Sequence, residues 1–434
     1  MHGPEGLTHG IKVGLAVFYL VMVLANLGFA AYQYYRRRDL RQAVIWSAVA
    51  GLFFLHAVAI LVVPAAVTLP QGFKDLTTRI MGAYGGQAGP ILYTVVSVIA
   101  FAAFLYWRRF FTEPAVAWAI LNLGLLASGW AMTDPNFRKI ITKEDNVPIS
   151  ILILTVAFFT WLGMRQAVLN DDRLARGEPP AEKLEDEKVL VWPDLVYTEL
   201  ICMVVATFLL VVWSVFLKAP LEQPASSAKA PNPSKAPWYF LGLQEMLVYY
   251  DPWMAGVVLP TMIIVGLIAI PYIDFNQKGN GYYTFAQRKF AWTMFLLGFV
   301  VMWVTLIVLG TFLRGPNWNF FGPFEYWDPH KVLPLNNINL SEYFWVGFLH
   351  QTLPKNMIIR ELPGIILVLG YLLLLPPLLA KTVMRSFFIK MGFIRFFLLV
   401  NLLQFMAALP IKMLLRWAFN LKYIVYFPEI FFNI

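Results

Sequence analysis

The chain has 434 residues, of which 59% are hydrophobic and only 14% are charged. Soluble globular domains carry about 25% charged residues, so this composition excludes a soluble enzyme, a disordered tail and a nucleic-acid-binding domain. The net charge of +9 comes from basic residues that lie mostly in short segments between apolar runs, a pattern typical of membrane topology. The single cysteine, Cys202, lies in an apolar run, which excludes internal disulfides, an iron–sulfur ligand set and a Cys-x-x-Cys-His haem attachment.

A helix that spans a membrane needs about 20 predominantly apolar residues. The chain contains ten such segments, which predict an all-α, polytopic membrane helix bundle with about 10 transmembrane helices. In chain order they are 11–34, 43–69, 90–111, 115–132, 148–168, 194–217, 252–273, 290–313, 362–380 and 393–415.

Lysine and arginine concentrate in alternate connections between these segments, including 36–41, 108–109 and the polar stretch 170–192. Because basic connections remain on the cytoplasmic side, we expect these to be cytoplasmic and the N-terminus of this multi-pass protein to be extracytoplasmic. The opposite side then carries the proline-rich stretch 218–236, expected to be extended, and the long loop 314–361.

A composition break at 170–192, rich in charge and poor in apolar residues, reads as a cytoplasmic linker. Residues 1–169 before it form a five-helix membrane region that carries no motif of known role, and a scaffold or docking function is expected for it. After the linker, residues 381–434 add an extra helix and an aromatic tail that we expect at the membrane interface.

The histidines limit what the chain can ligate. A haem held between two membrane helices usually needs two facing histidines, and His56 is the one histidine within a predicted helix. We therefore expect no haem on this chain alone, no metal site, and a packed, hydrogen-bonded His56. His330 and His350 lie in the long outer loop, where solvated or interface positions and ligation of a partner's haem or metal are both open.

Residues 237–253, PWYFLGLQEMLVYYDPW, carry the clearest chemical signal. In a short helix over 238–249, Trp238 and Glu245 are two turns apart and share a face. Asp251 and Pro252 suit the N-cap and first turn of the next spanning helix. A carboxylate in an apolar, aromatic setting suits a group that exchanges protons near neutral pH, and the aromatic wall suits a flat apolar ring. This predicts a quinone site; an amphipathic helix in the aromatic belt of the membrane explains the pattern equally well.

The stretch 193–380 resembles the C-terminal half of cytochrome b, the part that forms subunit IV of cytochrome bf complexes. The resemblance rests on WPDLVYTEL at the start of a spanning helix, the proline-rich loop, APWYF at 236–240, DPW at 251–253 and the helices that follow. The family's Pro-Glu-Trp-Tyr motif reads Ala236-Pro237-Trp238-Tyr239 here, so the aromatic pair is kept and the glutamate is replaced by Pro237. The segment looks like bacterial members with proline at that position, which resemble menaquinone users.

The resemblance implies a subunit of a quinol–cytochrome c oxidoreductase of the cytochrome bc type, inactive alone, in the bacterial inner membrane. It implies an outer quinol-oxidation site with Pro237, Trp238, Tyr239 and Pro252 against the quinone, and with Glu245 and Tyr239 as catalytic residues. Glu245 would replace the missing glutamate as proton acceptor. The b haems and a Rieske iron–sulfur cluster would lie on partners: a cytochrome b N-terminal-half subunit, a Rieske protein and a c-type cytochrome, in a homodimeric assembly.

In the family, the loop at 314–361 lies where a Rieske protein or cytochrome c docks. Candidate contacts are the aromatic residues of this loop, although packing on their own subunit explains them equally well; they are Trp318, Phe320, Phe321, Tyr326 and Trp327.

Two other functions stay open. The loss of the motif glutamate allows a structural membrane subunit with a vestigial quinone site. A transporter is less favoured, because the predicted helix interiors are nearly free of charge and the two halves share no visible pattern.

Overall fold

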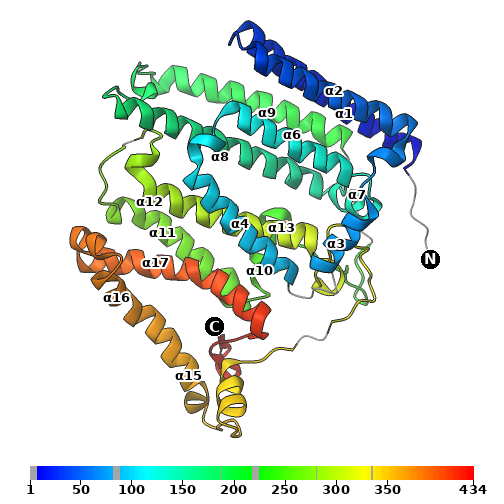
Figure 1. Cartoon of the computed structure of the whole chain (residues 1–434). Coiled ribbons are helices and arrows are strands. Elements are labelled where there is room, and N and C mark those ends of the chain that lie inside the picture. The colour runs from blue at the N-terminus through cyan, green and yellow to red at the C-terminus, as the bar shows by residue number, and fades with distance from the viewer. Residues whose placement is uncertain (1–6, 82–87, 186, 218–223, 280, 334–335) are drawn as a thin grey trace. The chain divides into compact units, whose positions relative to one another are not determined.

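The computed structural model describes residues 7–81, 88–185, 187–217, 224–279, 281–333 and 336–434. Within these residues ten helices are long and apolar enough to cross a membrane, which confirms the predicted all-α polytopic bundle (Figure 1). They are α1 (His9–Tyr35), α2 (Leu40–Val62), α4 (Ala88–Tyr106), α6 (Pro114–Ala131), α8 (Asn146–Ala175), Val191–Phe216 with α9 (Val196–Phe216), Met254–Ile273 with α11 (Leu259–Ile273), Phe285–Leu313 with α12 (Phe285–Leu296) and α13 (Val304–Val308), Met357–Lys381 with α15 (Met357–Leu369) and α16 (Leu375–Lys381), and α17 (Arg385–Phe419).

Short helices and one small hairpin complete the described chain. The second span ends at Val62, seven residues before its predicted end, because Pro64 disfavours helical geometry at Val63. The short elements are α3 (Gln71–Met81), α5 (Arg108–Phe111), α7 (Pro135–Ile141), α10 (Trp238–Met246), α14 (Leu340–Glu342) and the antiparallel strands β1 (Tyr426–Phe427) and β2 (Phe432–Asn433). Residues 224–237 have no regular structure, as predicted for the proline-rich loop.

The contacts divide the chain into two compact units. The first comprises residues 1–86, 107–165 and 321–327, and the second comprises 87–106, 166–320 and 328–434. Helix α4 therefore packs within the second unit although it precedes the polar linker in sequence. The polar segment after residue 170 begins as helix, because α8 continues to Ala175 and buried Asn170 donates hydrogen bonds to Glu182 and to the carbonyl of Tyr283.

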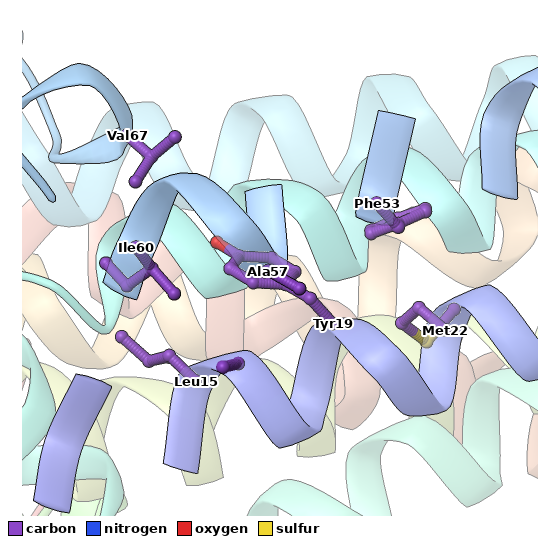
Figure 2. Close-up of a cluster of buried hydrophobic side chains, with 8 residues drawn as sticks. Leu15, Tyr19, Met22, Phe53, Ala57, Ile60 and Val67 are labelled. Atoms are coloured by element: carbon purple, nitrogen blue, oxygen red, sulfur yellow. The ribbon is translucent and has the colours of Figure 1, made fainter. Parts of the chain in front are cut away.

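The core of the first unit lies between α1 and α2, which pack along each other; Figure 2 shows the buried side chains between them. Tyr19 and Phe53 are fully buried there. His56 lies near this core: its Nδ1 is 2.8 Å from the carbonyl oxygen of Leu52, and its ring contacts those of Tyr19 and Trp130. The predicted packing of His56 is thus confirmed.

A buried amide network, which the hydropathy pattern does not reveal, joins α1 to α6. Asn26 donates to the side-chain oxygen of Asn122 at 2.6 Å, and the Trp118 indole donates to Asn26 at 2.9 Å. Asn26 is fully buried. Side-chain amides within apolar helices favour association with whichever helix satisfies them, so this network specifies the pairing of α1 with α6.

A glycine on α6 permits the close approach of Tyr19. A Cβ atom at Gly129 would lie 2.6 Å from the Tyr19 hydroxyl, whereas a Cβ at Gly124 of the same helix would meet nothing within 4 Å. We predict that Gly129→Ala destabilises the protein by ~1–3 kcal/mol through overpacking, and that Gly124→Ala is neutral or slightly stabilising because alanine favours helix. Thermal unfolding of the two purified variants checks this. Equal unfolding temperatures for both would contradict the packing.

Candidate functional site

Helix α10 packs closely on the Phe285–Leu313 span of the second unit. Leu241 and Gly242 are buried. A Cβ at Gly242 would lie 3.1 Å from the Trp303 ring, and a Cβ at Gly310 would lie 3.1 Å from the side chain of Leu241. Gly242 on α10 and Gly310 on this span therefore allow the two helices to pack closely.

The first turn of α10 presents an exposed aromatic face. Trp238 is 39% exposed, Tyr239 is 53% exposed, and Phe240 is exposed beside them. The ring centroids of Trp238 and Tyr239 are 5.7 Å apart at 84°. Pro237, which precedes the helix, and Pro252, which begins the next span, are also exposed. The structure therefore places all four predicted quinone-contact residues at the surface.

Glu245 lies near the C-terminal end of α10, fully buried and ion-paired. Arg314, which follows the Phe285–Leu313 span, donates from Nη2 to Glu245 Oε1 at 2.8 Å and from Nε to Oε2 at 3.1 Å. The Tyr249 hydroxyl donates to Oε1 at 2.9 Å, and the Trp318 indole donates to Oε2 at 3.2 Å. Both carboxylate oxygens are thus satisfied in a bidentate arrangement.

This arrangement corrects one expectation. The predicted apolar setting of Glu245 is wrong, because a guanidinium 69 residues away in sequence covers it. Trp238 and Glu245 are two turns apart as expected, yet one is exposed and the other is buried. The chain after the Phe285–Leu313 span folds over the C-terminal end of α10 and leaves its N-terminal end uncovered.

The pKa directions agree with a charged pair. Burial is the largest influence on the Arg314 guanidinium and lowers its pKa, but the charges and hydrogen bonds of Glu245 and Tyr249 together outweigh burial and raise that pKa above its usual value. Burial, then the Glu245 charge, raises the pKa of Tyr249 well above its usual value. Tyr249 therefore remains protonated and donates to the carboxylate.

The turn after the Phe285–Leu313 span places Arg314 and Trp318 together. Arg314 pairs with Phe320 in an antiparallel bridge, and its guanidinium lies 3.5 Å from the centre of the Phe320 ring. Asn317 and Trp318 have positive φ angles of 56° and 58°. Such a backbone is unusual for tryptophan and costs on the order of 1–3 kcal/mol. The indole hydrogen bond to Glu245 offsets this cost, so the turn and the ion pair support each other.

The proline-rich loop before α10 is fixed by polar side chains. Gln244 accepts a hydrogen bond from the backbone N–H of Ala236 and donates to the carbonyl of Ser234. Lys235 donates to the carbonyl of Thr311 at 2.8 Å, and Asn232 exchanges hydrogen bonds with Asn317. Residues 232–237 therefore have a defined course, although residues 224–237 contain no helix or strand.

The C-terminal tail folds back onto the junction between α10 and the next span. Lys422 donates to the carbonyls of Leu247 and Val248, where cations stabilise a helix end. Tyr423 and Asn433 each donate to Asp251 at 3.2 Å. Asp251, predicted as an N-cap, thus directs its carboxylate to the tail. Sequence inspection did not predict this contact.

The five aromatic residues proposed for partner docking differ in exposure. Phe320 and Phe321 are buried, which corrects their assignment as docking contacts, because they pack within the chain. The Trp318 indole donates a hydrogen bond to Glu245, and Trp327 packs against the Phe321 ring. Tyr326, at 64% exposure, is the one of the five that remains open to a partner.

Within the described residues no cluster of three or more histidine, cysteine, aspartate or glutamate side chains has the arrangement of a metal site. His2 lies outside the described residues. His330 and His350 are both exposed. The candidate site is the exposed aromatic surface of α10 together with the buried Glu245–Arg314 pair.

Comparison with known proteins identifies a family for this segment. Residues 224–324, less than a quarter of the chain, match the family model described as cytochrome b(C-terminal)/b6/petD. The match confirms the resemblance over these residues and includes α10, Glu245, Arg314 and Trp318. It supports a membrane subunit of the cytochrome bc/b6f type. No solved structure matches the chain.

Removal of one member of the buried ion pair should strongly destabilise the protein. We predict that Arg314→Met destabilises the protein by ~3–5 kcal/mol, because Glu245 would remain buried without its cation. The double variant Glu245→Met/Arg314→Met should recover part of this loss. Arg165→Met, which breaks the partly exposed pair with Glu113, should cost at most about 1 kcal/mol. Thermal unfolding followed by tryptophan fluorescence measures all three. Equal losses for Arg314→Met and Arg165→Met would contradict a special role for the buried pair.

Proposed function

We propose that this protein is a membrane subunit of a quinol-oxidising complex of the cytochrome bc type and contributes the outer quinol-oxidation site. The observation that carries the proposal is the exposed aromatic face of α10, held in place by the buried Glu245–Arg314 pair, within the segment that matches the cytochrome b family.

The proposed quinol lies against Trp238 and Tyr239, with Pro237 and Pro252 at the edge of the surface. Aromatic rings offer a flat apolar face for the quinol ring. The Tyr239 hydroxyl is the group on this face that can exchange a hydrogen bond with a quinol hydroxyl. Menaquinol is the proposed substrate, since the segment has proline before its Trp-Tyr pair, as do the bacterial members of the family that resemble menaquinone users.

We propose that Glu245 acts as a positioning residue. Its carboxylate is fully buried and accepts hydrogen bonds from Arg314, Tyr249 and Trp318. Protonation of Glu245 would leave Arg314 as an uncompensated buried charge. Direct proton transfer from quinol to Glu245 would require this cluster to open, whereas support of the aromatic face requires it to remain closed.

The redox centres belong to partners in this proposal. Within the spans, His56 Nδ1 lies 2.8 Å from the carbonyl oxygen of Leu52 and its ring contacts those of Tyr19 and Trp130, and we propose that His56 is a packing residue. A cytochrome b N-terminal-half subunit would supply the b haems, and a Rieske protein and a c-type cytochrome would accept electrons. The complex would be a homodimer in the bacterial inner membrane, with the N-terminus of this chain and the loop 314–361 extracytoplasmic. Tyr326 is the proposed contact for a docking partner.

The aromatic face is tested in the purified complex. We predict that Trp238→Ala raises the KM for a soluble menaquinol analogue about tenfold, because the loss of ~1.4 kcal/mol of contact corresponds to one decade of affinity. Trp107→Ala removes an exposed tryptophan of the first unit and should leave KM unchanged. An unchanged KM in Trp238→Ala would refute the quinol surface and favour a structural subunit with a vestigial site.

The role of Glu245 is tested with Glu245→Gln by separate measurement of assembly, KM and the pH profile of turnover. As a positioning residue, Glu245→Gln should raise KM several-fold in the complexes that assemble and leave the pH profile unchanged. A proton acceptor would instead lose about 10²–10⁴-fold in turnover together with one limb of the pH profile. A purely structural residue would reduce the amount of complex and leave both quantities intact, so either of these two outcomes would contradict the proposed role.

A further inference from the structure

A deep apolar groove lies within the second unit, between the Met254–Ile273 span, the Phe285–Leu313 span and α17. Its volume is about 940 Å³, at the upper end of the ~300–1,000 Å³ typical of ligand sites. Two glycines leave room in it: a Cβ at Gly266 would lie 3.4 Å from Leu402, and a Cβ at Gly298 would lie 3.3 Å from Met406. The side chains of α17 thus reach across to form one wall of the groove.

The side chains that line the groove are flexible as well as apolar. Six of the lining residues are methionines, drawn from all three spans and from α10: Met246, Met262, Met294, Met302, Met391 and Met406. Methionine side chains are unbranched and adjust to flexible apolar shapes. Such a wall suits acyl chains, which have no fixed conformation, better than it suits a rigid ring.

One end of the groove is polar and carries a positive charge. Asp274, Asn276 and Arg288 line that end. Arg288 is paired with Asp274, so this pair is neutral. Phe275 also lines the end, and the ammonium of Lys390 lies 5.7 Å from the centre of its ring. Lys390 therefore adds a cation at the rim.

The chain segments around this end of the groove are also positively charged. Residues 274–290 connect the Met254–Ile273 and Phe285–Leu313 spans, and residues 381–395 lead from the Met357–Lys381 span into α17. Together they contain seven lysines and arginines but one carboxylate, Asp274. Basic pockets between membrane helices on the basic side of the protein attract anionic headgroups. An apolar groove that ends in an excess of positive charge matches an anionic phospholipid, with its acyl chains between the helices and its phosphate at Arg288 and Lys390.

We propose that this groove is a specific site for an anionic phospholipid. The occupant would fill the space between α17, which lies outside the segment matched by the family model, and the two spans that lie within it. It would therefore join the C-terminal extension, residues 381–434, to the rest of the second unit. The proposal does not depend on quinol binding at α10.

The test uses the full chain, or its complex, reconstituted in nanodiscs with equal amounts of phosphatidylglycerol and phosphatidylcholine. After release into detergent, native mass spectrometry counts the lipids retained. The wild type should retain phosphatidylglycerol in preference to phosphatidylcholine, and Arg288→Gln/Lys390→Gln should reduce this retention at least about fivefold. Lys381→Gln removes one charge from the same basic segment; Lys381 is not among the residues that line the groove, and this variant should behave as the wild type.

A second measurement needs no variant. A phosphatidylglycerol with a photoreactive acyl chain should cross-link to peptides that contain residues 398–409 of the wild-type protein, and excess unlabelled phosphatidylglycerol should compete. Equal retention of the two lipids, a quinone recovered from the groove, or cross-linking of this face to a helix of another protein would each overturn the proposal.

Discussion

The buried pair of Glu245 and Arg314 is the constraint on which the candidate site depends. A carboxylate removed from water needs a cation and hydrogen-bond donors of its own, or its burial is prohibitive. Arg314 supplies two donors, and Tyr249 and Trp318 supply one each. To reach this carboxylate the chain must turn tightly after the Phe285–Leu313 span, with Asn317 and Trp318 in the left-handed region. The pair therefore fixes α10, the turn and the course of the loop before α10 together.

The C-terminal extension is a structural part of this assembly. Lys422, Tyr423 and Asn433 bind the junction after α10. The same tail lies against α15, where a Cβ at Gly364 would clash with the carbonyl oxygen of Ile424 and where buried Glu361 accepts a hydrogen bond from the N–H of Tyr426. The segment that matches the cytochrome b family thus acquires support from residues about 100 positions beyond its end.

The aromatic face of α10 and the groove along α17 are both apolar, but their polar groups differ. Tyr239 offers a neutral hydroxyl beside exposed rings, which suits a ligand with a flat ring and hydroxyl groups. The groove ends at Arg288 and Lys390, which suit a ligand with a negative charge and flexible chains. Apolar area alone does not distinguish ligands within a membrane, because lipid is as apolar as the lining. The polar groups at the end of each surface decide which ligand it selects.

The sequence by itself determined the ten spans, since a run of about 20 apolar residues has few alternatives to a membrane helix. It also identified α10 and its exposed aromatic residues, because these depend on a local motif. The tertiary structure alone decided what surrounds Glu245, where Phe320 and Phe321 pack, and which residues hold Asp251. Arg314 was the one clue in the sequence: an isolated cation that follows the uncharged residues 290–313 and precedes a Gly-Pro pair. Its partner lies 69 residues away, and pairing over that distance leaves no periodic trace in the sequence, because it arises only when the helices between the two residues have packed.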